Sequence, residues 1–131
     1  MHPWLKRLRH DLVKRAVWTA RDLREMGTAP TSEGLRALRS GLRVLVDPEG
    51  HAIDARSLWA LLRADAPPEV LADPAVRAAA EAFSAALDAA DLAVASLDDS
   101  PARAGEALET VLRLEPAFEE LARSMNRGVQ E

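Results

Sequence analysis

The residues of this sequence that could do chemistry are few, and none has the spacing of a metal or redox site. The three histidines, His2, His10 and His51, have no second histidine three or four positions away, the spacing that places two metal ligands on one helix face. The sequence contains no cysteine, so thiolate nucleophiles, disulfides and cysteine-ligated metals are excluded. We therefore predict neither a metal ion nor a cofactor.

Clustered acidic residues also lack the surroundings that acid–base catalysis requires. The run 47–51 resembles part of a calcium-binding loop, but Arg56 stands where that loop needs a bidentate glutamate. The pairs 98–99 and 119–120 fall at predicted helix ends or polar faces, where no apolar pocket would desolvate a general acid. The six glycines are dispersed, so no phosphate-binding loop is present. We predict no catalytic residues, and an enzyme or ligand binder with a pocket between helices remains the third alternative.

The most informative feature is a pair of tryptophans on the predicted first helix, residues 3–26. Its leucines form an apolar stripe, and at 100° per residue Trp4 and Trp18 lie about 100° and 140° from the centre of that stripe. Large aromatic residues beside arginines are typical of interaction hot spots. The sequence therefore predicts an interaction patch made of Trp4, Arg7, Asp11, Arg15, Trp18 and Asp22. The alternative is that other helices of the same chain cover both sides of this helix.

Charge is distributed unevenly along the chain. Residues 1–63 carry a net charge of +5, residues 64–73 of −3 and residues 74–131 of −6, which together give −4. Such asymmetry indicates either a nucleic-acid or lipid face on the basic half or two halves that attract each other on folding or dimerisation. We favour the second explanation, because the basic side chains scatter around the first helix instead of forming one stripe. Nucleic-acid binding by the basic first 43 residues remains the alternative function.

The elements that must position these residues are helices. The sequence predicts helices at 3–26, from residue 32 to about 45, from Asp54 to the prolines at 67–68, at 74–97 and from Pro101 onward. Pro116 either kinks the last of these or begins a sixth helix that ends at Gly128. A short hairpin at 44–53 is an alternative to the end of the second helix. Phe83 and Leu87 lie at the centre of the best apolar stripe.

These elements predict an all-α bundle of four to six helices. With 131 residues, 48% of them hydrophobic and 29% charged, the chain has the size and composition of a single globular domain. We expect a basic helical half at 1–63, a linker at 64–73 and an acidic helical half at 74–131. No stretch is long and apolar enough to span a membrane, so we expect a cytoplasmic protein. Its expected role is non-catalytic: it forms a homodimer or binds a protein partner through the first helix.

Overall fold

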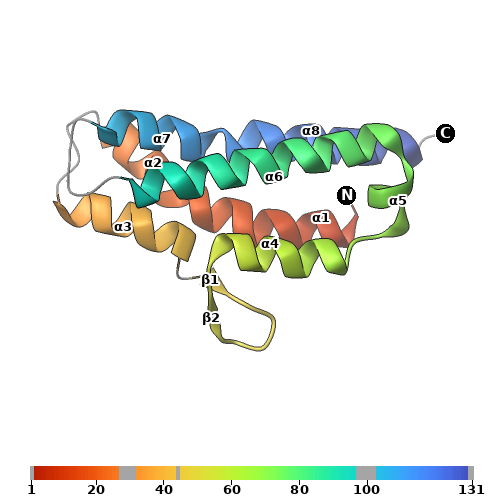
Figure 1. Ribbon diagram of the computed structural model, residues 1–131, viewed down its shortest axis with the longest axis horizontal. Helices are drawn as coiled ribbons and strands as arrows, with labels where there is room; N and C mark the ends of the chain where they lie inside the picture. The colour runs from red at the N-terminus through yellow and green to blue at the C-terminus, as the bar shows by residue number, and fades with distance from the viewer. Residues whose placement is uncertain (1, 27–31, 44, 97–102, 130–131) are drawn as a thin grey trace.

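The described residues form four helical rods in the computed structural model of the chain, and each rod runs antiparallel to the one that precedes it (Figure 1). The structure describes residues 2–26, 32–43, 45–96 and 103–129. Each rod packs against the one that precedes it. The predicted all-α fold is confirmed.

The first rod is one continuous helix of three segments, α1 (Pro3–Arg7), the π-helix η1 (Leu8–Val13) and α2 (Lys14–Met26). Pro3 occupies the first turn, where its missing N–H costs no hydrogen bond, and the His2 side chain accepts a hydrogen bond from the Trp4 backbone N–H at 3.0 Å. The helix predicted at 3–26 is confirmed, but its π-helical segment was not foreseen. The predicted stop at Gly27 lies outside the described residues.

The second rod consists of two helices separated by a hairpin that projects from the bundle (Figure 1). Helix α3 (Ser32–Arg43) is followed by strands β1 (Leu45–Val46) and β2 (Ala52–Ile53), and then by helix α4 (Ala55–Ala64). The strands pair antiparallel, so the hairpin predicted as an alternative at 44–53 is confirmed and the helix predicted to reach about residue 45 ends earlier. Gly50 has φ +88° in the turn, a conformation that favours glycine.

A carboxylate caps the helix that follows the hairpin. Asp54 precedes α4, and its Oδ1 accepts a hydrogen bond from the Ser57 backbone N–H at 2.7 Å. Hydrogen bonding by the Ser57 side chain, and next by the Ser57 backbone N–H, lowers the pKa of Asp54 below its ordinary value of 3.8, because these bonds favour the ionised carboxylate. The predicted cap is therefore present.

We expect Asp54→Ala to lower the free energy of unfolding by about 1 kcal/mol at pH 7, because the first turn of α4 loses its cap. The pKa of Asp54 is lower in the folded than in the unfolded protein, so the charge-dependent part of this contribution is present above pH 3.8 and is lost as pH falls further. Urea titrations at pH 7 and below pH 3 measure both effects. Asp54→Asn is the matched control: it retains the cap and should lose less stability at pH 7, whereas equal losses for both variants would contradict the capping role.

Part of the segment predicted as a linker is helical. Helix α5 (Pro68–Ala72) lies within 64–73, and its Val70 is buried. The third rod, α6 (Pro74–Ala95), begins directly afterwards with Asp73 as its cap and Pro74 in its first turn. The helix predicted at 74–97 is confirmed to Ala95.

The fourth rod is broken near its middle. It comprises α7 (Ala104–Leu112) and α8 (Leu114–Val129), with Arg113 between them. Pro116 lies in the first turn of α8, so a sixth helix begins there, as one of the two alternatives predicted. The prediction that Gly128 ends this helix is wrong, because α8 continues to Val129. The predicted start at Pro101 lies outside the described residues.

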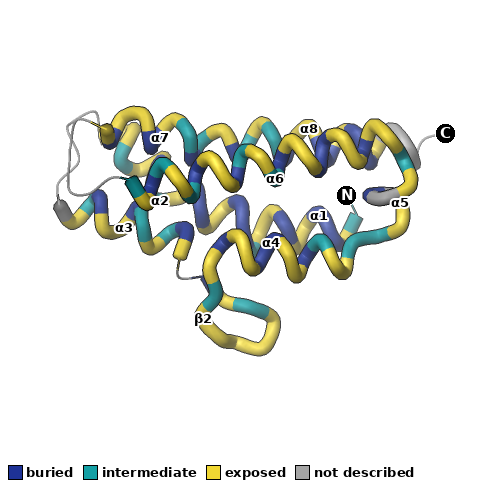
Figure 2. The backbone as a smooth tube through the Cα atoms, viewed as in Figure 1, coloured by how far each residue is buried: buried dark blue, intermediate teal, exposed yellow. Residues whose placement is uncertain are grey.

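Buried side chains of the described residues form one cluster between the rods (Figure 2). Phe83 and Leu87, predicted to lie in the core, are 0% and 1% exposed. The Trp59 ring packs against Phe83 with centroids 4.8 Å apart and against Trp4 with centroids 6.1 Å apart. Aromatic side chains from three rods therefore meet at the centre of the bundle.

Ion pairs connect the basic half of the chain to the acidic half. On one side of the bundle Arg21 lies 2.6 Å from Glu115, and on another Arg56 lies 3.0 Å from Asp88. Further pairs of the same kind join Arg24 to Glu109 and Arg63 to Glu81. Exposed ion pairs contribute little energy each. These pairs nevertheless show that some of the basic side chains of residues 1–63 lie against acidic side chains of residues 74–131 in the folded chain.

Candidate functional site

The π-helical segment η1 determines which side chains of the first rod face outward. A π turn holds about one residue more than an α turn, so residues after η1 are rotated by about 100° from their positions in an uninterrupted helix. Trp4 before η1 and Val17 and Ala20 after it are all buried, although an uninterrupted helix would separate them by about 140° or more. The rotation brings them to one side of the rod and turns Trp18 to the opposite side.

Trp4 belongs to the core, so the prediction that it forms part of a surface patch is wrong. Its side chain is 4% exposed, and its Nε1 donates a hydrogen bond to the Leu62 carbonyl oxygen at 2.7 Å. The second rod covers this side of the first one. The alternative prediction, that other helices of the same chain cover this side of the first helix, is correct for Trp4. The patch prediction is wrong because the spacing of an uninterrupted α-helix from residue 3 to residue 26 does not include the π-helical segment η1.

Two charged residues of the predicted patch are also separated from Trp18. Arg7 lies on the same side of the bundle as α4 and pairs with Asp65 at 3.2 Å. Asp11 lies within η1, is half-buried and lines neither of the hollows beside Trp18. The structure therefore keeps Arg15, Trp18 and Asp22 together on α2 and leaves Trp4, Arg7 and Asp11 elsewhere on the rod.

Trp18 is the exposed centre of a different set of residues. Its side chain is 66% exposed and lies between two hollows, one of about 440 Å³ toward α3 and one of about 360 Å³ along α2. The hollow toward α3 reaches Gly41 and Leu45, so an inserted side chain would contact both α2 and the second rod. We call the Trp18 face the surface formed by His10, Lys14, Arg15, Trp18, Asp22 and Glu25.

The charged residues of the Trp18 face do not pair with one another or with the rest of the described chain. Lys14, Arg15, Asp22 and Glu25 are exposed, and none takes part in an ion pair among the described residues. Arg21, which borders the face, differs because it pairs with Glu115. Unpaired charges around an exposed tryptophan can make specific contacts with a docked surface.

His10, Lys14 and Glu25 belong to this face although sequence reasoning missed them. On an uninterrupted helix, His10 lies about 80° from Trp18, and Asp11 lies much closer to it. The π-helical segment reverses that order, and His10, not Asp11, lines the hollow beside Trp18. The periodicity of the sequence contains no signal for this change, because the apolar residues of η1 fit either helix type.

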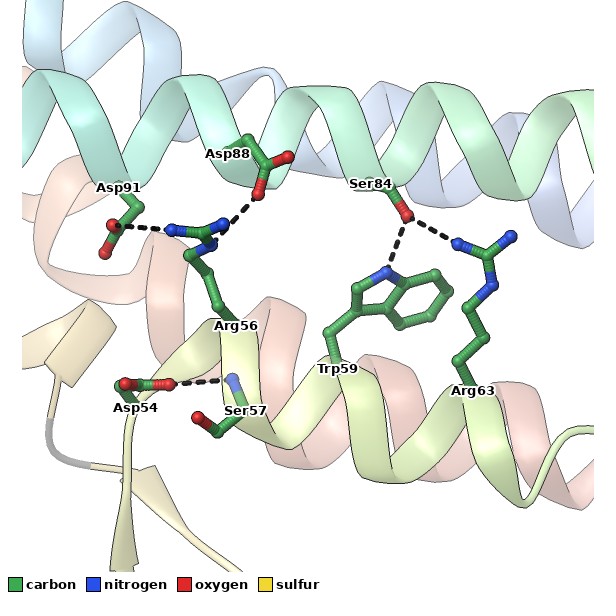
Figure 3. Close-up of polar contacts among 8 residues, drawn as sticks. All are labelled: Asp54, Arg56, Ser57, Trp59, Arg63, Ser84, Asp88 and Asp91. Atoms are coloured by element: carbon green, nitrogen blue, oxygen red, sulfur yellow. Dashed lines mark hydrogen bonds and ion pairs between the residues drawn. The ribbon is translucent and has the colours of Figure 1, made fainter.

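A second groove, of about 580 Å³, runs between α4 and α6. Side chains of α4 point across it toward side chains of α6 (Figure 3). The Arg56 guanidinium lies 3.0 Å from Asp88 and 3.9 Å from Asp91. Its charge is therefore already matched by carboxylates of the neighbouring rod.

Two serines, Ser57 and Ser84, line this groove, and the partners of Ser84 are hydrogen-bond donors (Figure 3). The Ser84 Oγ accepts hydrogen bonds from Trp59 Nε1 at 2.7 Å and from Arg63 Nη1 at 3.2 Å. A nucleophilic serine needs a base that accepts its proton, whereas an indole N–H and a guanidinium only donate. These contacts join α4 to α6, and we assign the groove a structural role.

A further hollow, of about 380 Å³, lies between the first rod and α8. Its floor is apolar, with Val13 and Phe118 buried, and its rim carries both arginines and glutamates. The Arg21–Glu115 pair crosses this rim. Nothing in this arrangement selects one class of ligand.

Comparisons with protein-family models, with curated proteins and with solved structures gave no significant match to this chain. Within the described ranges, no helix is both long and apolar enough to cross a membrane. The same part of the chain holds no group of three or more histidine, aspartate or glutamate side chains arranged to bind a metal ion.

Proposed function

We propose that this protein is a non-catalytic helical protein that docks another protein surface through the Trp18 face. The observation that carries the proposal is the 66% exposure of Trp18, while the side chains of Trp4 and Trp59 are 4% and 6% exposed. A chain of this size that buries two tryptophans in its own core leaves the third at the centre of unpaired charges.

The energetics of docking favour this site over the other exposed apolar positions. Covering a large aromatic side chain contributes about 2–3 kcal/mol, and tryptophan is enriched among the residues that dominate protein interfaces. Met26, Leu61 and Leu92 are also exposed, but none of them lines either of the two hollows beside Trp18. Trp18 combines an aromatic anchor with a hollow on either side.

Nucleic-acid binding, the alternative, has weaker support. A protein that binds phosphates needs lysines and arginines that are free to displace counterions. In the first 43 residues, Arg7, Arg21 and Arg24 are engaged in ion pairs with carboxylates outside the first rod. The Trp18 face also carries Asp22 and Glu25, whose charge would repel a phosphate backbone.

Site-specific photocrosslinking tests the proposal without knowledge of the partner. A benzophenone amino acid replaces Trp18 in one variant and Leu92 in another, and each is irradiated in the cells that express the protein. Because Leu92 is 68% exposed on α6, it is a matched control for exposure. We expect protein adducts, identified by mass spectrometry, at position 18 and not at position 92.

Two results would contradict the docking role of this face. Equal adduct yields at the two positions would mean that position 18 reports random collision. The absence of any adduct at position 18 would remove the support for the Trp18 face, since a docked surface would lie within reach of the benzophenone.

A further inference from the structure

We propose that the occupant of the Trp18 face is a second copy of this chain, docked by antiparallel, two-fold pairing of the two α2 helices about Trp18. This inference rests on the proposed function, because it names the partner of the same face. Three features of the protein support a second copy: the order of charges along α2, the hollow beside Trp18 and the rotation that η1 introduces.

The Trp18 face has opposite charges on the two sides of its tryptophan. Lys14 and Arg15 precede Trp18, and Asp22 and Glu25 follow it. In a two-fold antiparallel pair centred on Trp18, each residue faces the residue at the same distance on the other side of position 18. Lys14 of each copy then faces Asp22 of the second copy, which gives two reciprocal ion pairs that flank the tryptophans.

The rotation at η1 extends this complementarity toward the N-terminus. In an uninterrupted helix Asp11 would approach Glu25 of the second copy, and the two carboxylates would repel each other. In the structure His10 lines the hollow beside Trp18 and Asp11 does not. Glu25 of the second copy therefore approaches His10 and Lys14 instead of a carboxylate.

This arrangement brings one pair of like charges together, but a carboxylate of the same chain already offsets one of the two. Arg15 faces Arg21 of the second copy, but Arg21 pairs with Glu115 of its own chain at 2.6 Å. The Glu115 carboxylate therefore offsets part of the Arg21 charge that Arg15 of the second copy would meet. The parallel arrangement has no such compensation, because Lys14 would meet Lys14 and Asp22 would meet Asp22.

The hollow toward α3 provides space for the indole of the second copy. It is lined by Trp18, Thr19, Gly41 and Leu45 together with the basic residues of the face. Gly41 has no side chain, and a Cβ at this position would lie 3.5 Å from the Ala16 carbonyl oxygen and 3.6 Å from the Arg15 carbonyl oxygen, so α3 approaches α2 closely beside the hollow. Each Trp18 can thus be inserted beside α3 of the other copy while the two α2 helices stay in contact.

Charge reversal at Lys14 and Asp22 tests the pairing. Sedimentation equilibrium measures the dimer dissociation constant of the full chain, and circular dichroism confirms that each variant is folded. We expect Lys14→Asp and Asp22→Lys each to raise the dissociation constant about tenfold, because both reciprocal pairs become like-charged. The double variant, Lys14→Asp with Asp22→Lys, should return to the wild-type value, and an equimolar mixture of the two single variants should form heterodimers.

Lys6→Asp is the matched control, because it makes the same charge change at an exposed position of the same rod, outside the Trp18 face. It should leave the dissociation constant unchanged. The inference is overturned if the wild type is monomeric at about 100 μM, or if the single variants dimerise as tightly as the wild type. It also fails if the double variant does not recover.

The photocrosslinking experiment separates this failure from failure of the proposed function. Adducts of position 18 with another protein, together with a monomeric wild type, would overturn the second copy as partner and support the docking face. Absence of all adducts, together with a monomeric wild type, would overturn both.

Discussion

Replacing Phe83 by alanine is expected to lower the free energy of unfolding by about 3–5 kcal/mol. Phe83 is 0% exposed on α6, and its ring packs 4.8 Å from that of Trp59 on α4. Truncation would leave a cavity between two rods that the backbone of a helix bundle can close only in part. A domain of this kind has about 5–15 kcal/mol of total stability, so this single change removes a large share of it.

Chemical denaturation followed by circular dichroism measures this loss. The matched control is Leu92→Ala, a truncation on the same helix at a side chain that is 68% exposed, which should change stability by less than about 0.5 kcal/mol. If Phe83→Ala proves too unstable to study, Phe83→Leu retains most of the volume and should still unfold more easily than the wild type. A loss below about 1 kcal/mol for Phe83→Ala would contradict the packing of α6 described above.

Trp4→Ala and Trp18→Ala are expected to have opposite consequences, although both residues lie on the first rod. Trp4→Ala should cost about 3–5 kcal/mol of stability, because the buried indole and its hydrogen bond to the Leu62 carbonyl are lost. Trp18→Ala should change stability by less than about 0.5 kcal/mol under conditions where the protein is monomeric. The comparison separates a tryptophan of the core from a tryptophan of the docking face.

Trp4→Phe distinguishes the hydrogen bond from the packing. Phenylalanine fills most of the space but has no N–H, so we expect a smaller loss than for Trp4→Ala, about 1–3 kcal/mol. Urea titrations of the three variants at low protein concentration give the values. Similar losses for Trp4→Ala and Trp18→Ala would mean that the rotation at η1 does not occur in solution.

Most of the fold could be predicted from the sequence because its signals are local. Asp54 and Asp73 cap helices within two or three residues of themselves, and Pro74 sits where a helix tolerates it. The 22-residue helix α6 has an apolar stripe long enough to place Phe83 in the core without knowledge of its neighbours. The hairpin was harder to predict, because its strands are only two residues long. Two residues are too few to show the alternation of a strand and so to exclude the end of a helix.

The candidate site could be predicted only in part because it depends on a change of helix type. Arg15, Trp18 and Asp22 lie on α2 after η1, so their positions relative to one another follow ordinary helical spacing. Trp4 lies before η1, and the added residue of the π turn separates it from Trp18. Where the apolar pattern is continuous, packing against the other rods decides whether the segment is α-helical or π-helical. The sequence of that segment alone carries no information about this packing.

The π-helical segment also has a meaning for the comparison of related sequences. Residues 3–7 and 14–26 keep separate helical phases, and Leu8–Val13 absorbs the difference between them. An insertion or deletion of one residue elsewhere in the first rod would rotate part of its apolar side out of the core. Within Leu8–Val13, a deletion would convert the π turn to an α turn and leave both flanking segments helical. An alignment of relatives should therefore place its single-residue gaps in this segment, and a relative with such a gap would still present its counterpart of Trp18 at the centre of the exposed face.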